Sequence, residues 1–220
     1  MDKIEILIFT DPMMGLSYEA EPIIDRLEEE YKEKITFIPV MSLLVDDVYR
    51  FCDHNDLKIS KEYALKRYLP KLASIYKEEE SISNLPINMD GFHLFDKDHT
   101  SSLPLNLAYL AVKLIEPDKL KDFLRVLRRK TIVETKQTTD LNIILEVVNS
   151  LNIDKEAFLS AYDSNDVKKM LLDDLSLRNK YHIYSLPSYL IRYKGQEVLM
   201  QGFCYYSQLN RAVKTLILKS

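Results

Sequence analysis

Residues 11–22 read Asp11-Pro12-Met13-Met14-Gly15-Leu16-Ser17-Tyr18-Glu19-Ala20-Glu21-Pro22. The preceding residues 4–10 are almost continuously apolar, which is typical of a strand buried on both faces of a sheet. In residues 20–31, apolar side chains recur at helical spacing opposite acidic ones, which predicts an amphipathic helix. The quoted stretch is therefore expected to be the turn through which the chain leaves a buried strand and enters a helix.

The residues that follow complete a strand–helix–strand unit. Residues 35–41 alternate in polarity and contain Pro39, which has no N–H to donate to a neighbouring strand. We therefore expect a second strand near the edge of the sheet. Two parallel strands joined by a helix form a right-handed unit, so the chain is expected to begin with a βαβ arrangement.

A long helical block comes next. Helical patterns cover residues 58–76, 105–115, 118–130, 140–151 and 154–162. Pro70 is expected to kink or end the first of these helices, because proline lacks the N–H that an inner helical turn needs. The basic run at residues 125–130 is expected to be the solvated face of its helix.

The last part of the chain returns to a mixed pattern. Residues 166–180 predict a helix, and residues 188–193 and 197–201 predict a hairpin around Lys194-Gly195. A final helix carries Leu209, Val213, Leu216 and Ile217 on one face. The expected order is β-α-β, a helical block, and then α-β-β-α, which is an α/β fold.

Composition limits the classes of partner and site. The net charge of −4 and the pI of about 5.7 do not favour nucleic acid or an anionic membrane. No stretch has the length of a membrane span, and residues 1–5 lack a signal-peptide layout. Cys52 and Cys204 are far apart, so we expect incidental or structural thiols in a reduced, cytoplasmic protein. The histidines show no metal-ligand spacing, and neither a metal nor another cofactor is expected.

The quoted turn resembles the active-site turn of DsbA-like thioredoxin-fold proteins. That family reads Asp-Pro-x-Cys-x-x-Cys-(Trp/Tyr)-x-x-Glu-Pro. The matching positions here are Asp11, Pro12, Tyr18, Glu21 and Pro22. The resemblance implies a thioredoxin fold made of residues 1–50 and 165–220, with residues 51–164 as a helical insertion. It also implies that the insertion covers the active-site face.

The two cysteine positions of that frame hold Met14 and Ser17. A dithiol site works because a cysteine at a helix N-terminus has a lowered pKa, and a second cysteine resolves the mixed disulfide. Methionine has no ionisable S–H, and a serine hydroxyl forms no disulfide. The sequence therefore predicts a degenerate, redox-inactive site in which Met14 is an apolar filler.

Pro187 extends the expected site. In the resembling family this proline is cis and faces the active-site turn, and the residue before it, here Leu186, offers backbone hydrogen bonds to an extended peptide. We expect a surface groove with a free backbone edge, suited to the addition of a partner strand. The expected groove residues are Met14, Gly15, Leu16, Ser17, Tyr18, Leu186 and Pro187.

Within that family, the sequence most resembles a cytosolic branch from low-GC Gram-positive bacteria, which includes dithiol-disulfide isomerase-like proteins and an adaptor that presents the transcription factor Spx to the ClpXP protease. The likeness lies in the Asp11-Pro12 turn, in residues 95–113 and 140–146, and at Leu186-Pro187. It implies an adaptor that binds a protein or peptide segment. The adaptors of that branch tend to extend beyond the last thioredoxin helix, where this sequence ends.

Two enzyme functions remain as alternatives to the adaptor role. One is a degenerate dithiol-disulfide isomerase. The other is a glutathione-using transferase or isomerase, with an anion at the helix N-terminus. The kappa-class glutathione transferases and the hydroxychromene-carboxylate isomerases share the fold and use a serine at the first cysteine position. That position is Met14 here, so the serine on which those enzymes depend is missing from this sequence.

Overall fold

A computed structural model describes residues 3–219, in which a single four-stranded sheet has the strand order β2-β1-β3-β4. The strands are β1 (Ile4–Thr10), β2 (Ile35–Met41), β3 (Ser188–Tyr193) and β4 (Gln196–Gln201). β1 pairs in parallel with β2 and antiparallel with β3. The expectation that the Pro39 strand lies at an edge is confirmed, since β2 is the outer strand on that side.

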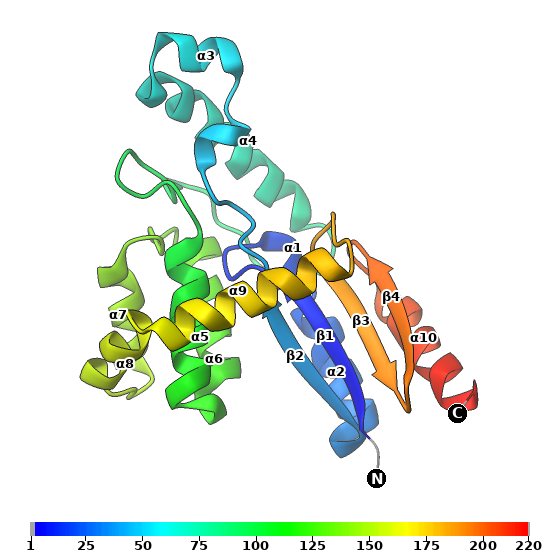
Figure 1. Cartoon of the computed structure of the whole chain (residues 1–220). Helices are drawn as coiled ribbons and strands as arrows, with labels where there is room; N and C mark the ends of the chain where they lie inside the picture. Colours follow the sequence, from blue (N-terminus) through cyan, green and yellow to red (C-terminus); the bar gives the residue numbers. More distant parts are fainter. Residues whose placement is uncertain (1–2, 220) are drawn as a thin grey trace.

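Helices cover both faces of this sheet (Figure 1). α9 (Asn165–Lys180) crosses one face, while α2 (Glu21–Tyr31) and α10 (Tyr206–Lys219) lie on the other. Every residue of β1 except Glu5 is buried. The continuous apolar run of β1 follows from this double coverage, because neither side of the strand faces water.

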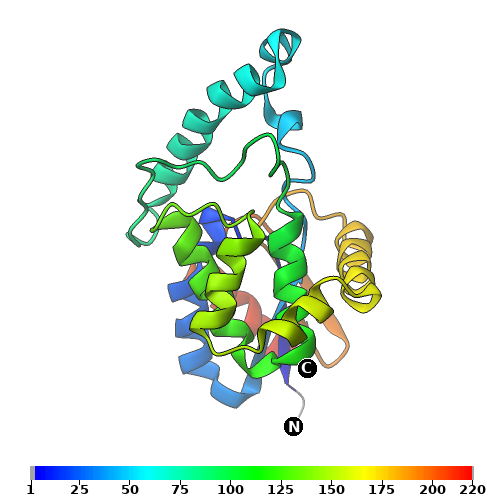
Figure 2. The same cartoon turned by 90° about the vertical axis from the view of Figure 1, so that its left-hand side faces the viewer.

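The segment between β2 and α9 is helical, and we call it the helical insertion. Its elements are η2 (Val48–Phe51), α3 (His54–Ile59), α4 (Lys61–Glu79), α5 (Leu103–Ile115), η3 (Pro117–Lys119), α6 (Leu120–Ile132), α7 (Leu141–Ser150) and α8 (Lys155–Tyr162). α5 is its centre, since α6, α7, α8 and α9 all pack around it. α3 and α4 form an arm that rises from the rest of the molecule (Figures 1 and 2). The predicted order of elements is confirmed.

Two helix boundaries differ from the sequence-based expectation. α4 continues through Pro70 rather than ending there. Pro70 is exposed on the arm, so the carbonyl that loses its helical partner can bond to water. The helix expected at residues 20–31 is preceded by a short α1 (Gly15–Glu19), and the two are separated at Ala20. Pro22 in the first turn of α2 accounts for this break, because proline favours a helix start.

The C-terminal half of α4 lies directly over α1, so the helical insertion covers the turn as predicted. The Tyr76 hydroxyl donates a hydrogen bond to the Met13 carbonyl. A Cβ atom added at Gly15 would lie 2.8 Å from Cδ1 of Tyr76 and 1.9 Å from Oε2 of Glu79. A side chain at position 15 would force both the Tyr76 ring and the Glu79 carboxyl group to shift.

Gly15→Ala should lower the free energy of unfolding by about 1–3 kcal/mol, because the added methyl group overpacks the contact between α1 and α4. Alanine normally stabilises a helix relative to glycine by about 1 kcal/mol. A decrease in the free energy of unfolding would therefore indicate overpacking rather than helix propensity. Urea denaturation measures the change, with Ser74→Ala on the exposed side of α4 as the control. A Gly15→Ala variant as stable as the parent chain would contradict this packing.

Candidate functional site

Asp11 anchors the turn that follows β1. Its side chain is fully buried, and its Oδ1 accepts a hydrogen bond from the Met13 N–H at 3.1 Å. Its Oδ2 accepts from the Leu44 N–H at 2.8 Å, the Ser102 hydroxyl at 2.7 Å and the Asn106 side-chain amide at 2.8 Å. Burial raises the pKa of Asp11, and these hydrogen bonds oppose the rise. One carboxyl group thus holds the turn against the loop after β2 and the start of α5.

Met14 is the residue that precedes α1, at the first of the two degenerate cysteine positions. It is only 8% exposed and packs in a cluster with Leu7, Phe9 and Leu186. The expected surface location of Met14 is therefore wrong. Its side chain fills space between the turn and the α9 face of the sheet, as expected of an apolar filler.

Ser17, at the second cysteine position, is also buried. Its Oγ accepts a hydrogen bond from the Thr10 hydroxyl at 2.7 Å. Thr10 in turn accepts from Nη2 of Arg128 at 3.0 Å. The serine is tied to a threonine and an arginine rather than to a histidine, so this contact does not activate it as a nucleophile.

The other expected groove residues are only partly brought together. The Leu186–Pro187 peptide bond is cis, as predicted. Leu186 and the half-buried Leu16 lie in the same cluster as Met14. Tyr18 instead faces the helical insertion, where its hydroxyl donates to the Pro86 carbonyl at 3.3 Å.

The remaining members of the expected groove lie elsewhere. Gly15 lies beneath α4. Ser17 and Pro187 line a separate cavity on the α2 side of the sheet. The expected residues therefore surround the turn on several sides rather than line one groove.

The native thiols lie away from the turn, and neither is close to a second cysteine. Cys52 ends η2 and is partly buried, whereas Cys204 is buried just before α10. Both are free thiols in the structure. Burial raises the pKa of each thiol, which reduces the fraction of nucleophilic thiolate.

Two buried carboxyl groups beside the turn were not anticipated from the sequence. Glu19 is fully buried, and its Oε2 accepts from the Ser83 N–H at 2.9 Å. Glu79 lies against Gly15, and burial together with the nearby Glu19 raises the pKa of Glu79 to about 7. Glu79 belongs to a run of glutamates at residues 78–80 that resembles any solvated helix end, so no local pattern marks it.

Arg128 corrects the expectation for the basic run at residues 125–130. It is 4% exposed, and its Nη1 donates to Oε1 of Glu21 at 2.9 Å. The neighbouring Arg129 does face solvent. α6 packs beside α2, and Arg128 lies one turn after Leu124 on the buried face of α6. That i, i+4 spacing from a buried leucine is the signal that could have identified it.

Metal-ligand groups and membrane-spanning helices are both absent from the described part of the chain. Across residues 3–219, His, Cys, Asp and Glu side chains form no group that could hold a metal ion. In the same part of the chain, none of the helices combines the length and hydropathy of a membrane span.

Comparisons with known proteins agree with this geometry. A family profile described as thioredoxin matches residues 7–210. The ClpXP adapter protein SpxH of Bacillus subtilis is 27% identical over 188 residues, which cover 84% of this chain and 57% of that protein. SpxH of Shouchella clausii is 23% identical over 193 residues, with 85% and 57% covered. The chain thus spans little more than half the length of these curated relatives.

Solved structures show the same fold. A candidate protein disulfide isomerase from Nitrosomonas europaea superposes with a TM-score of 0.80 at 17% identity, covering 99% of this chain and 98% of that one. The cytosolic disulfide reductase DsbM of Pseudomonas aeruginosa has a TM-score of 0.70 at 16% identity, with 98% and 100% covered.

The strand order, the helical insertion and the Asp11 turn define a DsbA-like thioredoxin-fold protein. The chain belongs to the thioredoxin family whose profile spans residues 7–210.

Glu79 should make stability depend on pH. Its pKa is about 7 in the folded chain against an ordinary value of 4.5, so the folded state holds this proton more tightly. The free energy of unfolding should therefore fall as pH rises from 4.5 to about 7. Glu79→Gln should flatten this slope, and Glu78→Gln on the exposed side of α4 should not. Denaturant titrations across that range measure the slopes, and equal slopes in Glu79→Gln and the parent chain would refute the assignment.

Proposed function

We propose that this chain is a redox-inactive, protein-binding adaptor built on the DsbA-like thioredoxin fold. The observation that carries the proposal is the state of the two former cysteine positions. Met14 is packed in an apolar cluster, and Ser17 is hydrogen-bonded to Thr10. Dithiol exchange requires a thiolate and a resolving thiol, which these side chains do not supply. The chain thus has the Asp11 turn and the cis bond before Pro187 of the DsbA-like frame, but not its two cysteines.

The relatives support a protein as the partner. Several SpxH proteins, named as ClpXP adapter proteins, are 23–27% identical to this chain. We propose a role of the same kind, in which the chain holds a segment of a regulator such as Spx for proteolysis by ClpXP. The free thiols Cys52 and Cys204 fit a reducing compartment, which supports the cytoplasm as the place of action.

The docking surface that we propose is narrower than the groove expected from the sequence. Leu186 is only 8% exposed, but among the described residues no hydrogen bond engages its backbone N–H or C=O, so both groups are available to pair with an added strand. Tyr184, which is 83% exposed, lies two residues before Leu186. Tyr205, at 57%, follows the end of β4. Gln201 at that end accepts a hydrogen bond from the Tyr184 N–H at 3.0 Å, which holds the two loops together.

A bound segment would therefore meet a main-chain edge flanked by aromatic side chains. Exposed tyrosines are suited to such contacts because each has a large apolar ring and a polar end. Leu16 adds apolar surface on the side of the turn. We propose the Leu186 backbone, Leu16, Tyr184 and Tyr205 as the recognition surface, with the buried Met14 beneath it.

Insulin reduction in the presence of dithiothreitol should stay at background for the unmodified chain. Met14→Cys combined with Ser17→Cys should gain activity, because the second position follows the first across one helical turn at the start of α1. The Cys52→Ala, Cys204→Ala variant is the control for the native thiols. Turnover by the unmodified chain above that control would refute redox inactivity.

Replacing Tyr184 and Tyr205 with Ala should weaken binding of a purified Spx-type regulator by about 1–3 kcal/mol, because exposed aromatic anchors dominate such contacts. Leu172→Ala, which removes an exposed leucine from α9, is the matched control. Calorimetric titration gives the affinities. Unchanged affinity in the double variant would show that the regulator binds at another surface of the chain. Strong thermal stabilisation by glutathione without regulator binding would favour the transferase or isomerase alternative.

A further inference from the structure

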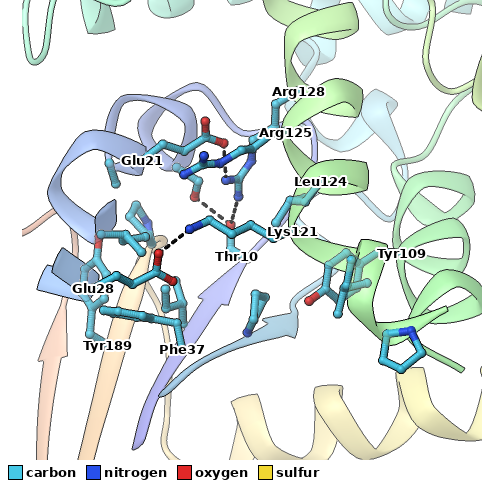
Figure 3. A pocket seen from close by; sticks show the side chains of 18 residues that line it. Thr10, Glu21, Glu28, Phe37, Tyr109, Lys121, Leu124, Arg125, Arg128 and Tyr189 are labelled. Atoms are coloured by element: carbon cyan, nitrogen blue, oxygen red, sulfur yellow. Dashed lines mark hydrogen bonds and ion pairs between the residues drawn. The ribbon is translucent and has the colours of Figure 1, made fainter. Parts of the chain in front are cut away.

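A cavity of about 270 Å³ lies between the sheet and the helical insertion. Its lining comes from β1, β2, β3 and α2 on one side and from α5 and α6 on the other. Figure 3 shows the side chains that surround it, with Tyr109 and Tyr189 on opposite sides. Small-molecule sites occur preferentially at such boundaries between structural units.

Most of the wall is apolar. The apolar lining includes Ile8, Ile24, Phe37, Pro39, Leu120 and Leu124. The space is large enough for a small organic molecule. This surface favours a hydrocarbon chain or an aromatic ring over a highly polar molecule.

Three hydrogen-bond donors in the wall lack partners among the described residues, whereas Thr10, Ser17 and Glu21 in the same wall are hydrogen-bonded. Arg128, Tyr109 and Tyr189 are all buried. Nε of Arg128 and the hydroxyl groups of both tyrosines lack a hydrogen-bond partner within the described residues. Burial raises the pKa of both tyrosines, so each keeps its proton and can donate it. Buried donors are almost always paired in native proteins, so these three indicate an absent acceptor.

The mouth of the cavity is charged. Lys121 on α6 forms ion pairs with Glu28 and, at 3.2 Å, with Asp25 on α2. Arg125 forms an ion pair with the same Asp25. Lys121, Glu28 and Arg125 are partly exposed and also line the cavity, so these ion pairs lie at its boundary between α2 and α6. A molecule inside would contact the sheet and the insertion at once.

We propose that this cavity binds a small monocarboxylic acid with an aliphatic or aromatic body. The carboxylate oxygens accept from Arg128 Nε and the tyrosine hydroxyls, and the body packs on the apolar wall. Glu21 already occupies Nη1 of Arg128, which leaves Nε as the free donor of the guanidinium group. Hydrogen bonds to a charged acceptor are stronger than those to a neutral one, which favours an acid over the matching alcohol.

The test compares acids with alcohols of equal size. Hexanoate, octanoate and benzoate are titrated into the full chain beside 1-hexanol, 1-octanol and benzyl alcohol, with thermal shift and calorimetry as readouts. We expect at least one acid to stabilise the chain and to bind more tightly than its alcohol. Tyr109→Phe and Tyr189→Phe should each lower the affinity of the chain for that acid by roughly 3- to 10-fold. Tyr63→Phe, at an exposed tyrosine on α4, should leave its affinity unchanged.

A second variant locates the binding. Leu124→Phe fills the cavity from α6 and should abolish binding of the acid while the chain remains folded by circular dichroism. Binding of no acid, or equal binding of acid and alcohol with no effect of the tyrosine variants, would overturn the proposal. So would unchanged acid binding in a folded Leu124→Phe variant. None of these measurements involves a protein partner, so their failure is distinct from failure of the adaptor role.

Discussion

The structure depends on the buried carboxyl group of Asp11. It joins the turn after β1 to the loop after β2 and to the start of α5, through Met13, Leu44 and Asn106. A hydrogen bond to a charged group contributes about 1.5–3 kcal/mol, and an unpaired buried carboxylate is costly. Loss of this aspartate would leave several buried donors without an acceptor. The need to satisfy them explains how the Asp-Pro frame of a dithiol site remains useful in a chain whose site has no thiols.

Arg128 makes a second tie between the same two parts of the molecule. It reaches from α6 to Glu21 on α2 and to Thr10 at the end of β1, and Thr10 bonds to Ser17. The two positions that hold cysteines in the DsbA-like frame have structural contacts here: Ser17 belongs to this hydrogen-bonded chain, and Met14 fills an apolar cluster. The same guanidinium group also lines the cavity between the sheet and the helical insertion. Arg128 therefore both holds α6 against α2 and provides a polar group in the wall of that cavity.

Much of the fold could be predicted from local patterns. The continuous apolar run of β1, the proline in β2 and the spacing of α10 each reflect burial of one element, which the period of the side chains records. The cis bond before Pro187 was predicted from the resemblance to the DsbA-like frame. The basic run was predicted wrongly at Arg128, which is buried because α2 lies beside α6. α4 does not end at Pro70, whose side of the helix faces water.

By itself, the sequence determined which chemistry the turn can perform, because a side chain's functional groups depend only on residue identity: Met14 and Ser17 carry no thiol in any fold. Only the tertiary structure decided where these and other groups lie. It placed Glu79 against Gly15, dispersed the expected groove residues around the turn, and gathered Arg128, Tyr109 and Tyr189 about one cavity. Thr10 and Arg128 are 118 residues apart in the chain. Contacts at such separations arise from the packing of whole elements, which no local periodicity encodes.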